Sequence, residues 1–490
     1  MNYRSTRSDY CCNSLQAVLQ GISPDGGLFI APEILSEEFD WKSVLGLSTL
    51  QMAQKILCHL LPDFQDMETL VGKAYLNKFE TEDLTPLVQV GEYYILELFR
   101  GPTSAFKDVA LSMLPQLITA AKKQTGCKDE TVILTATSGD TGKAAMEGFH
   151  DVDGTRIIVF YPHGGVSPIQ KAQMETQEGK NVKVCAVRGN FDDCQSAVKL
   201  AFEKINKLDA LKKAHKSLSS ANSINIGRLA PQVVYYFKAY SDLVGQERIK
   251  IGDLIDFVVP SGNFGDILAG YFAKLMGLPV RHLVCASNEN KVLTDFLNTG
   301  VYDKRRPFYK TSSPSMDILV SSNLERLLFL ACGCKTVKVA SWMKDLKEND
   351  CFHVDQDVIS TIQQTFKAYC CTEEETISTI GNTFNINHYL CDPHTAVGMK
   401  VAKDYKKDFQ DDVPVVVLST ASPYKFPAAV SKALGLTLKG DEYKQIEAIN
   451  KRTGIVVPKN LSALQNKPIL HNEVIDRDEI IDYVLKSCEI

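Results

Sequence analysis

The chain has 490 residues, too many for one hydrophobic core, so we expect two or three domains of roughly 100 to 200 residues each. Its 44% hydrophobic and 23% charged residues are typical of a globular protein in water. A net charge of -5 offers no basic surface to nucleic acid, and the sequence has neither a signal-peptide pattern nor an apolar run of membrane-spanning length. We therefore expect a cytoplasmic protein that binds neither nucleic acid nor membrane.

Residues 1–82 carry helix-like hydrophobic patterns, of which residues 41–61 give the clearest. A turn-rich insert, SPDGGLF, interrupts them at residues 23–29. These features predict a mainly helical N-terminal domain.

From about residue 85 onward, short β-branched runs alternate with amphipathic segments. The predicted strands are residues 93–99, 131–136, 156–162, 182–187, 256–260, 281–286 and 413–420. The predicted helices are residues 107–124, 192–208, 227–244 and 264–277. Most strand runs are apolar throughout, which is typical of a parallel sheet covered by helices on both faces.

The strands form two groups, one before about residue 190 and one after residue 255, with a long helical stretch between them. This grouping predicts an α/β fold with two parallel-sheet lobes and a central cleft, where small ligands commonly bind. Residues 300–390 are predicted to be mostly helical. The expected division is an N-terminal domain at 1–82, a two-lobed α/β domain at 83–430 and a helical tail at 431–490.

Fourteen cysteines are scattered along the chain or occur as adjacent pairs. No paired C-x-x-C or H-E-x-x-H pattern is present, so we expect no metal site. Free thiols in a reducing compartment are the expected state.

Three loops that follow predicted strands carry hydroxyls or glycines. The first, TATSGDTGKAA at 135–145, resembles a nucleotide-binding P-loop only in part, because Thr137 and Ala144 replace its required glycine and hydroxyl. The loop could hold a carboxylate or phosphate through Thr137, Ser138, Thr141 and backbone N–H groups, or could simply cap a helix.

The second loop, PSGNFGDILAG at 260–270, lies between a predicted strand and a predicted helix. Gly262 and Gly265 would let the backbone approach an anion, and the helix dipole favours a phosphate there. The dinucleotide-binding spacing is absent, so the alternatives are a phosphate cup and an ordinary turn. The third loop, LSTASPYKFPAAV at 418–430, places Ser419, Thr420 and Ser422 at a strand end, where hydroxyls commonly cap a helix.

A lysine, Lys107, begins an apolar run in the stretch GPTSAFKDVALSML at 101–114. A single lysine there is most often a surface residue. Combined with a phosphate cup and hydroxyl-lined loops, however, it fits a pyridoxal-phosphate site. Such a site needs a lysine amine that can lose its proton, and partial burial promotes that loss.

Seven segments occur in a fixed order between about residue 3 and residue 430: YRSTR, SPDGGLF, GPTSAFKD, TATSGDTG, SANSIN, VPSGNFGD and KFPAAV. Together they resemble the threonine synthases, a family of fold type II enzymes that use pyridoxal 5'-phosphate. The segments YRSTR and DGGLF distinguish this family from dehydratases and cysteine synthases of the same fold.

The resemblance implies that Lys107 is the catalytic lysine and forms the Schiff base with the cofactor. It assigns to the cofactor's phosphate a cup formed by Gly262, Asn263, Phe264, Gly265 and Asp266. It places Thr420 at the pyridine nitrogen. Asp140 is assigned to the cofactor as well, although relatives of this fold often have an asparagine there, beside the phenolic oxygen. The residues expected near the substrate carboxylate are Thr137, Ser138, Gly139 and Thr141, with Asn222, Ser223 and Asn225 as second contacts.

The implied reaction converts O-phospho-L-homoserine and water to L-threonine and phosphate, by elimination at Cγ and addition of water at Cβ. The leaving phosphate needs a cationic or hydroxyl-lined pocket, for which Arg228, Lys143, Thr103 and Ser104 are candidates. An alternative is a phospho-lyase on the same cofactor that yields 2-oxobutyrate and ammonia. A non-catalytic protein that kept the fold is a second alternative, and the intact Lys107 argues against it.

Two positions depart from the family pattern. Arg100 precedes GPT and Ser422 follows the strand 413–420, and both positions commonly hold histidine in the family. Neither change removes a step that the reaction needs, but both residues are expected beside the site, where they could alter phosphate handling or proton delivery. The family contains monomers and dimers, so either a monomer or a homodimer is expected.

Overall fold

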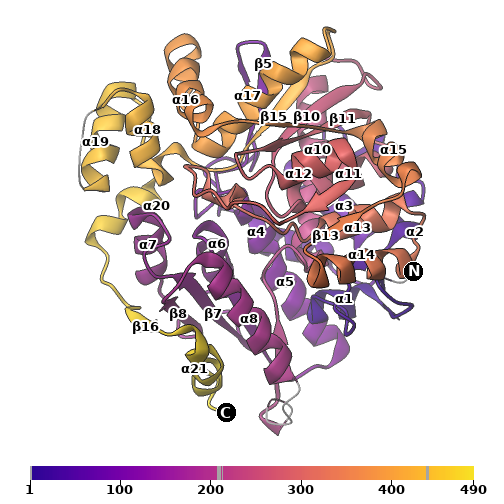
Figure 1. The fold of residues 1–490 in the computed structure, drawn as a ribbon, viewed down its shortest axis with the longest axis vertical. Helices are drawn as coiled ribbons and strands as arrows, with labels where there is room; N and C mark the ends of the chain where they lie inside the picture. Colours follow the sequence, from indigo (N-terminus) through magenta and orange to yellow (C-terminus); the bar gives the residue numbers. More distant parts are fainter. Residues whose placement is uncertain (1–2, 207–210, 212, 437–440) are drawn as a thin grey trace.

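Two β-sheets organise the protein, whose computed structural model describes residues 3–206, 211, 213–436 and 441–490 (Figure 1). The larger sheet has six strands in the order β14 (Phe366–Cys370), β11 (Val280–Ser287), β10 (Ile255–Pro260), β15 (Val415–Ser419), β5 (Tyr93–Glu97) and β4 (Leu87–Val90). The smaller has five, in the order β16 (Glu473–Ile475), β8 (Val182–Val187), β7 (Thr155–Pro162), β6 (Glu130–Ala136) and β9 (Lys216–Ser219). All pairs are parallel except β4 with β5, which confirms an α/β fold with two parallel-sheet lobes.

Four helices lie at nearly the predicted positions, namely α5 (Lys107–Thr125), α8 (Phe191–Asn206), α10 (Ile226–Gly245) and α11 (Gly265–Leu275). Helix α6 (Asp140–Phe149), which follows β6, was not among the predicted helices. Residues 207 and 208 of the predicted helix 192–208 lie outside the described residues. Helix α10 is buried along most of its length, and it packs on α5 and α11, so it belongs to the shared core of the two lobes.

The sequence assigned one strand to the wrong group. Residues 93–99 were predicted with the early strands, but β5 pairs with β15, more than 300 residues later in the chain. Strand pairing is a long-range property that local hydrophobicity does not fix. For the same reason the predictions missed β14 within the mostly helical region 300–390, and missed β16 in the tail.

The N-terminal residues add a small antiparallel sheet and four helices. The strands are β1 (Tyr3–Ser5), β2 (Cys11–Cys12) and β3 (Phe29–Ile30), and the helices are α1 (Ser14–Gln20), α2 (Pro32–Ser36), α3 (Thr49–Leu60) and α4 (Met67–Tyr75). The predicted helical pattern at 41–61 divides into a short 3-10 turn (Trp41–Val44) and α3, because Gly46 adopts a φ of 75° between them. This segment shares one hydrophobic core with α5 and α10.

The second half of the chain completes both lobes. Between the strands lie α12 (Val292–Thr299), α13 (Leu324–Ala331), α14 (Thr336–Glu348), α15 (Gln356–Thr365), α16 (Glu373–Asn387) and α17 (Pro393–Asp408), with a small hairpin of β12 (Val301–Asp303) and β13 (Cys351–His353). After β15 come the 3-10 turn η3 (Pro423–Lys425), α18 (Pro427–Ala433), α19 (Glu442–Thr453), α20 (Lys459–Ser462) and α21 (Ile480–Ser487). Residues 437–440 lie outside the described residues.

The C-terminal segment returns to the smaller lobe, where β16 extends the sheet beside β8 and α21 packs on α8 (Figure 1). Within the described part of the chain, no helix is long and apolar enough to cross a membrane. All fourteen cysteines are described, and each thiol is free.

Candidate functional site

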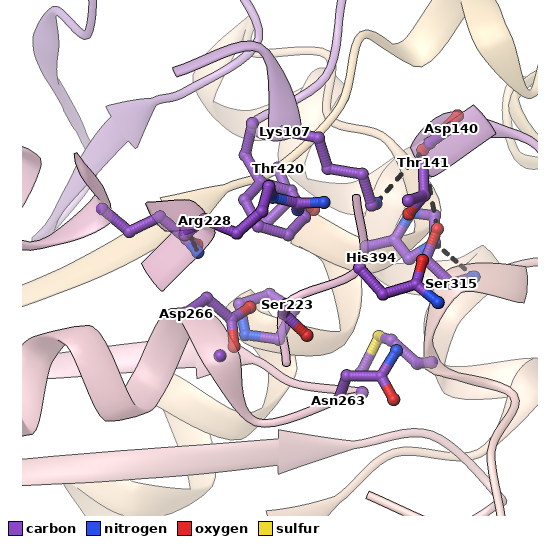
Figure 2. Close-up of a pocket in the computed structure, with 17 residues that line it drawn as sticks. Lys107, Asp140, Thr141, Ser223, Arg228, Asn263, Asp266, Ser315, His394 and Thr420 are labelled. Atoms are coloured by element: carbon purple, nitrogen blue, oxygen red, sulfur yellow. Dashed lines mark hydrogen bonds and ion pairs between the residues drawn. The ribbon is translucent and has the colours of Figure 1, made fainter. Parts of the chain in front are cut away.

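A pocket lies where loops of both lobes meet, lined by residues from the strand ends and helix starts of each (Figure 2). The predicted site residues that line it are Lys107, Asp140, Thr141, Arg228, Gly262, Asn263, Gly265, Asp266 and Thr420, joined by Asn222 and Ser223. The predicted residues outside this lining are Thr103, Ser104, Thr137, Ser138, Gly139, Phe264, Asn225 and Lys143. The pocket therefore brings together residues as far apart in the sequence as Lys107 and Thr420.

Lys107 is the first residue of α5 and is only 8% exposed. Its Nζ lies 3.9 Å from Asp140 Oδ2 and 4.5 Å from the centre of the Phe106 ring. Burial lowers the pKa of Lys107 to about 8, assisted by the nearby Lys425 and opposed by Asp140. Compared with an ordinary lysine, the neutral fraction at pH 7 is thus larger by roughly two orders of magnitude. A neutral amine is the form that attacks a carbonyl carbon.

The hydroxyl groups of the loop before Lys107 form hydrogen bonds that stabilise this loop. Thr103 donates from Oγ1 to Asp108 Oδ1 at 2.5 Å, and its N–H donates to Oδ2 at 2.9 Å. Ser104, at a φ of 58°, donates from Oγ to Asn460 Oδ1 at 3.1 Å. Burial raises the pKa of Asp108 to about 6, against the hydrogen bonds from Thr103. These contacts hold the loop rather than facing the pocket.

Asp140, at the start of α6, is a buried carboxylate with several donors. Lys425 Nζ lies 2.8 Å from its Oδ1, and Gln170 Nε2 donates to the same oxygen at 2.9 Å. Although burial opposes ionisation, Lys425 and Lys107 outweigh it and hold the pKa of Asp140 below its usual range. The sequence reasoning missed Lys425, although a lysine in the apolar segment PYKFPAAV was a signal for a buried cation.

The rest of the loop at 135–145 closes on itself. The Thr137 hydroxyl accepts from the N–H groups of Gly139 at 3.0 Å and Gly142 at 2.9 Å, which caps the start of α6. A Cβ on Gly142 would lie 2.5 Å from Thr137 Cγ2, so the cap needs glycine there. Thr141 is the hydroxyl of this loop that lines the pocket.

The loop at 261–266 forms a concave turn at the start of α11. Gly262 has no room for a side chain, because a Cβ would lie 2.4 Å from the carbonyl oxygen of Ser315. Phe264, at a φ of 63°, is buried with its ring stacked on Phe366, so it supports the turn from behind. The first N–H groups of a helix lack partners within it and attract anions. This turn therefore offers an anion site.

Asp266 lies in the same turn and is held by its neighbours. Its Oδ1 accepts from Ser261 Oγ at 3.1 Å and from the N–H of Ile267 at 2.9 Å. Burial raises its pKa to about 6. Because its pKa is raised, Asp266 takes up a proton more readily than an exposed aspartate does, which reduces its repulsion of a nearby anion.

Arg228, near the start of α10, is a buried cation that lines the pocket. Nη1 donates to the Ala221 carbonyl oxygen at 2.5 Å, whereas Nε has no hydrogen-bond partner among the described residues. Burial lowers its pKa to about 10, so it remains positive at neutral pH. Lys143, the other predicted cation, is bound by Glu147 at 3.0 Å and by Gln177, away from the pocket lining.

A second polar group at the pocket was absent from the sequence reasoning. His394 accepts at Nε2 from the N–H of Ser315 at 3.2 Å, so its Nδ1 carries the proton and donates to Asp392 Oδ1 at 2.7 Å. Ser315 and His394 both line the pocket, as does Gln232. The fragment DPH at 392–394, an aspartate two residues before a histidine at a helix start, was the available signal.

The strand end of β15 contributes Thr420 to the pocket. Ser419 instead shares a 3.0 Å hydrogen bond with Thr395, and Ser422 accepts from the N–H of Tyr424 at 3.4 Å. Arg100 pairs with Glu97 at 2.6 Å and lies outside the pocket lining. Both positions that depart from the family pattern are therefore engaged in local structure.

Comparisons with known proteins support one assignment. A family model described as pyridoxal-phosphate dependent enzyme matches residues 78–421, and one described as threonine synthase, C-terminal, matches residues 395–479. The threonine synthase of Saccharomyces cerevisiae is 38% identical over 510 residues, which cover 95% of this chain and 96% of that protein. This chain belongs to the threonine synthase family.

A solved structure of the threonine synthase family agrees with this assignment. The PLP-bound threonine synthase from Brucella melitensis matches with a TM-score of 0.85 and 37% identity, over 100% of both chains.

Some relatives are longer than this chain. Threonine synthase-like 1 of Macaca fascicularis is 40% identical over 437 residues. That match covers 86% of this chain but 58% of the relative, so the chain spans little more than half the length of such relatives.

The pocket fits pyridoxal phosphate, the cofactor of this enzyme family. Lys107 provides an amine whose proton is easily lost. The turn at Gly262 packs closely against the Ser315 backbone only because it lacks a side chain, and Arg228 has an unused buried donor. Pyridoxal phosphate needs an amine to bind its aldehyde and hydrogen-bond donors to bind its phosphate, and an amino-acid substrate needs donors for its carboxylate.

Proposed function

We propose that the protein is a threonine synthase that converts O-phospho-L-homoserine and water to L-threonine and phosphate. The observation that supports this proposal most directly is that one pocket contains a buried lysine with a pKa of about 8, a turn at a helix N-terminus that can bind an anion, and a buried arginine. Membership in the threonine synthase family supports the choice of reaction.

In this proposal Lys107 anchors the cofactor, and Gly262, Asn263, Phe264, Gly265 and Asp266 form the cup for its phosphate. Phe264 contributes through the backbone, since its side chain faces the core. Thr420 would contact the pyridine nitrogen, where a hydroxyl would leave the ring less electron-withdrawing than a carboxylate would. When bound, pyridoxal phosphate supplies a reservoir for the negative charge that develops on the substrate carbon.

Lys107 would have a second role, as an acid and base toward the bound substrate. Its freed amine takes and returns protons at Cα and Cβ, which its pKa of about 8 allows near neutral pH. Arg228 faces the anionic end of the substrate, where its charge stabilises the phosphate as the bond to Cγ breaks. Thr141, which lines the pocket, binds the substrate carboxylate, and Thr137, Ser138 and Gly139, which lie outside the lining, form the loop that holds it in place.

Three further features belong to the proposal. The chain has an N-terminal domain at 1–82, a catalytic domain at 83–430 and a C-terminal tail at 431–490. It acts in the cytoplasm on this small substrate, and it does so as a monomer or a homodimer.

A product assay tests the reaction. Purified protein with pyridoxal phosphate receives O-phospho-L-homoserine, and threonine, phosphate, 2-oxobutyrate and ammonia are quantified, with Lys107→Ala as the inactive control. We expect threonine and phosphate in equal amounts. If 2-oxobutyrate and ammonia predominate, the protein is a phospho-lyase and the proposed synthase activity is wrong.

A further inference from the structure

Three buried charges lie together: Lys107 and Asp140 line the pocket (Figure 2), and Lys425, outside the lining, pairs with Asp140. Asp140 and Lys425 are 3% and 0% exposed, so water screens their interaction little. The two oxygens of the carboxylate face different partners. Oδ1 faces Lys425 at 2.8 Å, and Oδ2 faces Lys107 at the longer distance of 3.9 Å.

The orientation of Asp140 is fixed on the side away from Lys107. Gln170 donates to Oδ1, the oxygen that also pairs with Lys425. Lys425 is itself fixed, because its amine donates to the carbonyl oxygen of Thr103 at 3.0 Å. Asp140 can therefore turn toward Lys107 only by breaking contacts with two buried donors.

The other charged groups around Lys107 do not take the place of Asp140 as its ion-pair partner. Asp266 on α11 carries a carboxyl whose pKa burial raises to about 6, and Arg228 on α10 is a cation that disfavours a second positive charge. His394 on α17 is bound to Asp392, and Asp108, next to Lys107 in α5, is bound by Thr103. Among the described residues, Asp140 is the acid that forms an ion pair with the Lys107 amine.

We propose that Lys425 is a positioning residue that holds the Asp140 carboxylate away from Lys107, so that the Lys107 amine can release its proton to water and accept the cofactor. Without Lys425, Asp140 would keep Lys107 as its only cation and hold it protonated. Lys425 has this role only if Lys107 anchors pyridoxal phosphate as proposed above.

The test measures the proton on Lys107 itself. The full chain, freed of cofactor, is labelled with limiting acetic anhydride across about pH 6 to 10, and the labelled Lys107 peptide is quantified by mass spectrometry. A parallel titration follows the pH dependence of the rate at which added pyridoxal phosphate gives visible absorbance. The variants are K425M, K425R, D140N and D140N/K425M. K238M is the matched control, because Lys238 is also buried and paired, with Asp242 at 2.5 Å, outside the pocket lining.

We expect K425M to move the Lys107 midpoint upward by about one pH unit or more, and K425R to stay near the wild type. D140N should move it downward, and K425M should have a smaller effect in the D140N background. A K425M midpoint equal to those of wild type and K238M overturns the proposal. If K425M does not fold, D140N decides, because an unchanged midpoint there shows that Asp140 does not control Lys107.

The labelling curve separates this inference from the proposed function. Wild-type protein that stays colourless with pyridoxal phosphate refutes the cofactor role of Lys107, whatever the labelling shows. Normal colour and threonine formation with an unshifted K425M midpoint refute only the role of Lys425.

Discussion

Arg228 provides the sharpest prediction about substrate recognition. Of the four residues considered for the leaving phosphate, it lines the pocket, whereas Lys143, Thr103 and Ser104 are engaged elsewhere. Its Nη1 holds Ala221, and its Nε is buried with no partner among the described residues. Replacement by methionine removes the charge and the hydrogen-bond donors and leaves a shorter, unbranched apolar side chain.

The expected magnitude follows from one charge-assisted hydrogen bond, which contributes about 1.5 to 3 kcal/mol. Because 1.36 kcal/mol corresponds to a factor of ten in rate, R228M should lower kcat/KM by roughly 10- to 150-fold. R228K should lose part of this amount, since lysine keeps the charge but not the planar set of donors.

The assay measures kcat/KM for O-phospho-L-homoserine and the inhibition constant of inorganic phosphate, with pyridoxal phosphate affinity measured separately. K143M is the matched control, because its amine is bound by Glu147 and Gln177. The reasoning is refuted if R228M keeps kcat/KM within about twofold of the wild type while K143M loses activity. A large loss of cofactor affinity in R228M would instead place Arg228 at the cofactor.

Three other substitutions test separate parts of the site. G262A should weaken pyridoxal phosphate binding at least about tenfold in an absorbance titration, because its Cβ would lie 2.4 Å from the Ser315 carbonyl oxygen and force the turn open. Unchanged affinity would contradict the proposal that this turn binds the cofactor's phosphate. Burial raises the pKa of Asp108 to about 6, above its value in the unfolded chain, so folded protein binds more protons and loses stability as pH rises from about 4 to 6. D108N should flatten this decline, which amounts to at most about 3 kcal/mol, in denaturant unfolding at the two pH values, and an unchanged slope would count against it. H394A removes the acceptor for the Ser315 N–H, so it should destabilise the protein by about 1 to 3 kcal/mol in denaturant unfolding, whereas unchanged stability would show that this hydrogen bond contributes little.

Much of the site could be predicted because parallel strands end at the same edge of a sheet. Gly262 follows β10 and Thr420 follows β15, and these neighbouring strands of one sheet bring the two residues together. Asp140 follows β6 of the other sheet, and the pocket forms between these edges. Local hydrophobic patterns were sufficient to locate such strand ends.

The residues that escaped prediction depend on long-range packing. Ser315 lies in a short 3-10 turn (Pro314–Met316) without a strong local pattern, and its N–H donates to His394, 79 residues later in the chain. Lys425 received no role from the sequence, because its partner Asp140 lies nearly 300 residues earlier in the chain. Thr103 was predicted in the site because sequence shows a hydroxyl but not its partner, which is Asp108.

The most direct test of the central claim locates the cofactor on the chain. Protein incubated with pyridoxal phosphate is reduced with sodium borohydride, digested and mapped by mass spectrometry, with K107A as the control. We predict one modified peptide, carrying the cofactor on Lys107, and loss of the yellow colour on reduction. A cofactor fixed on another lysine, or a wild-type protein that binds none, would contradict the assignment of Lys107.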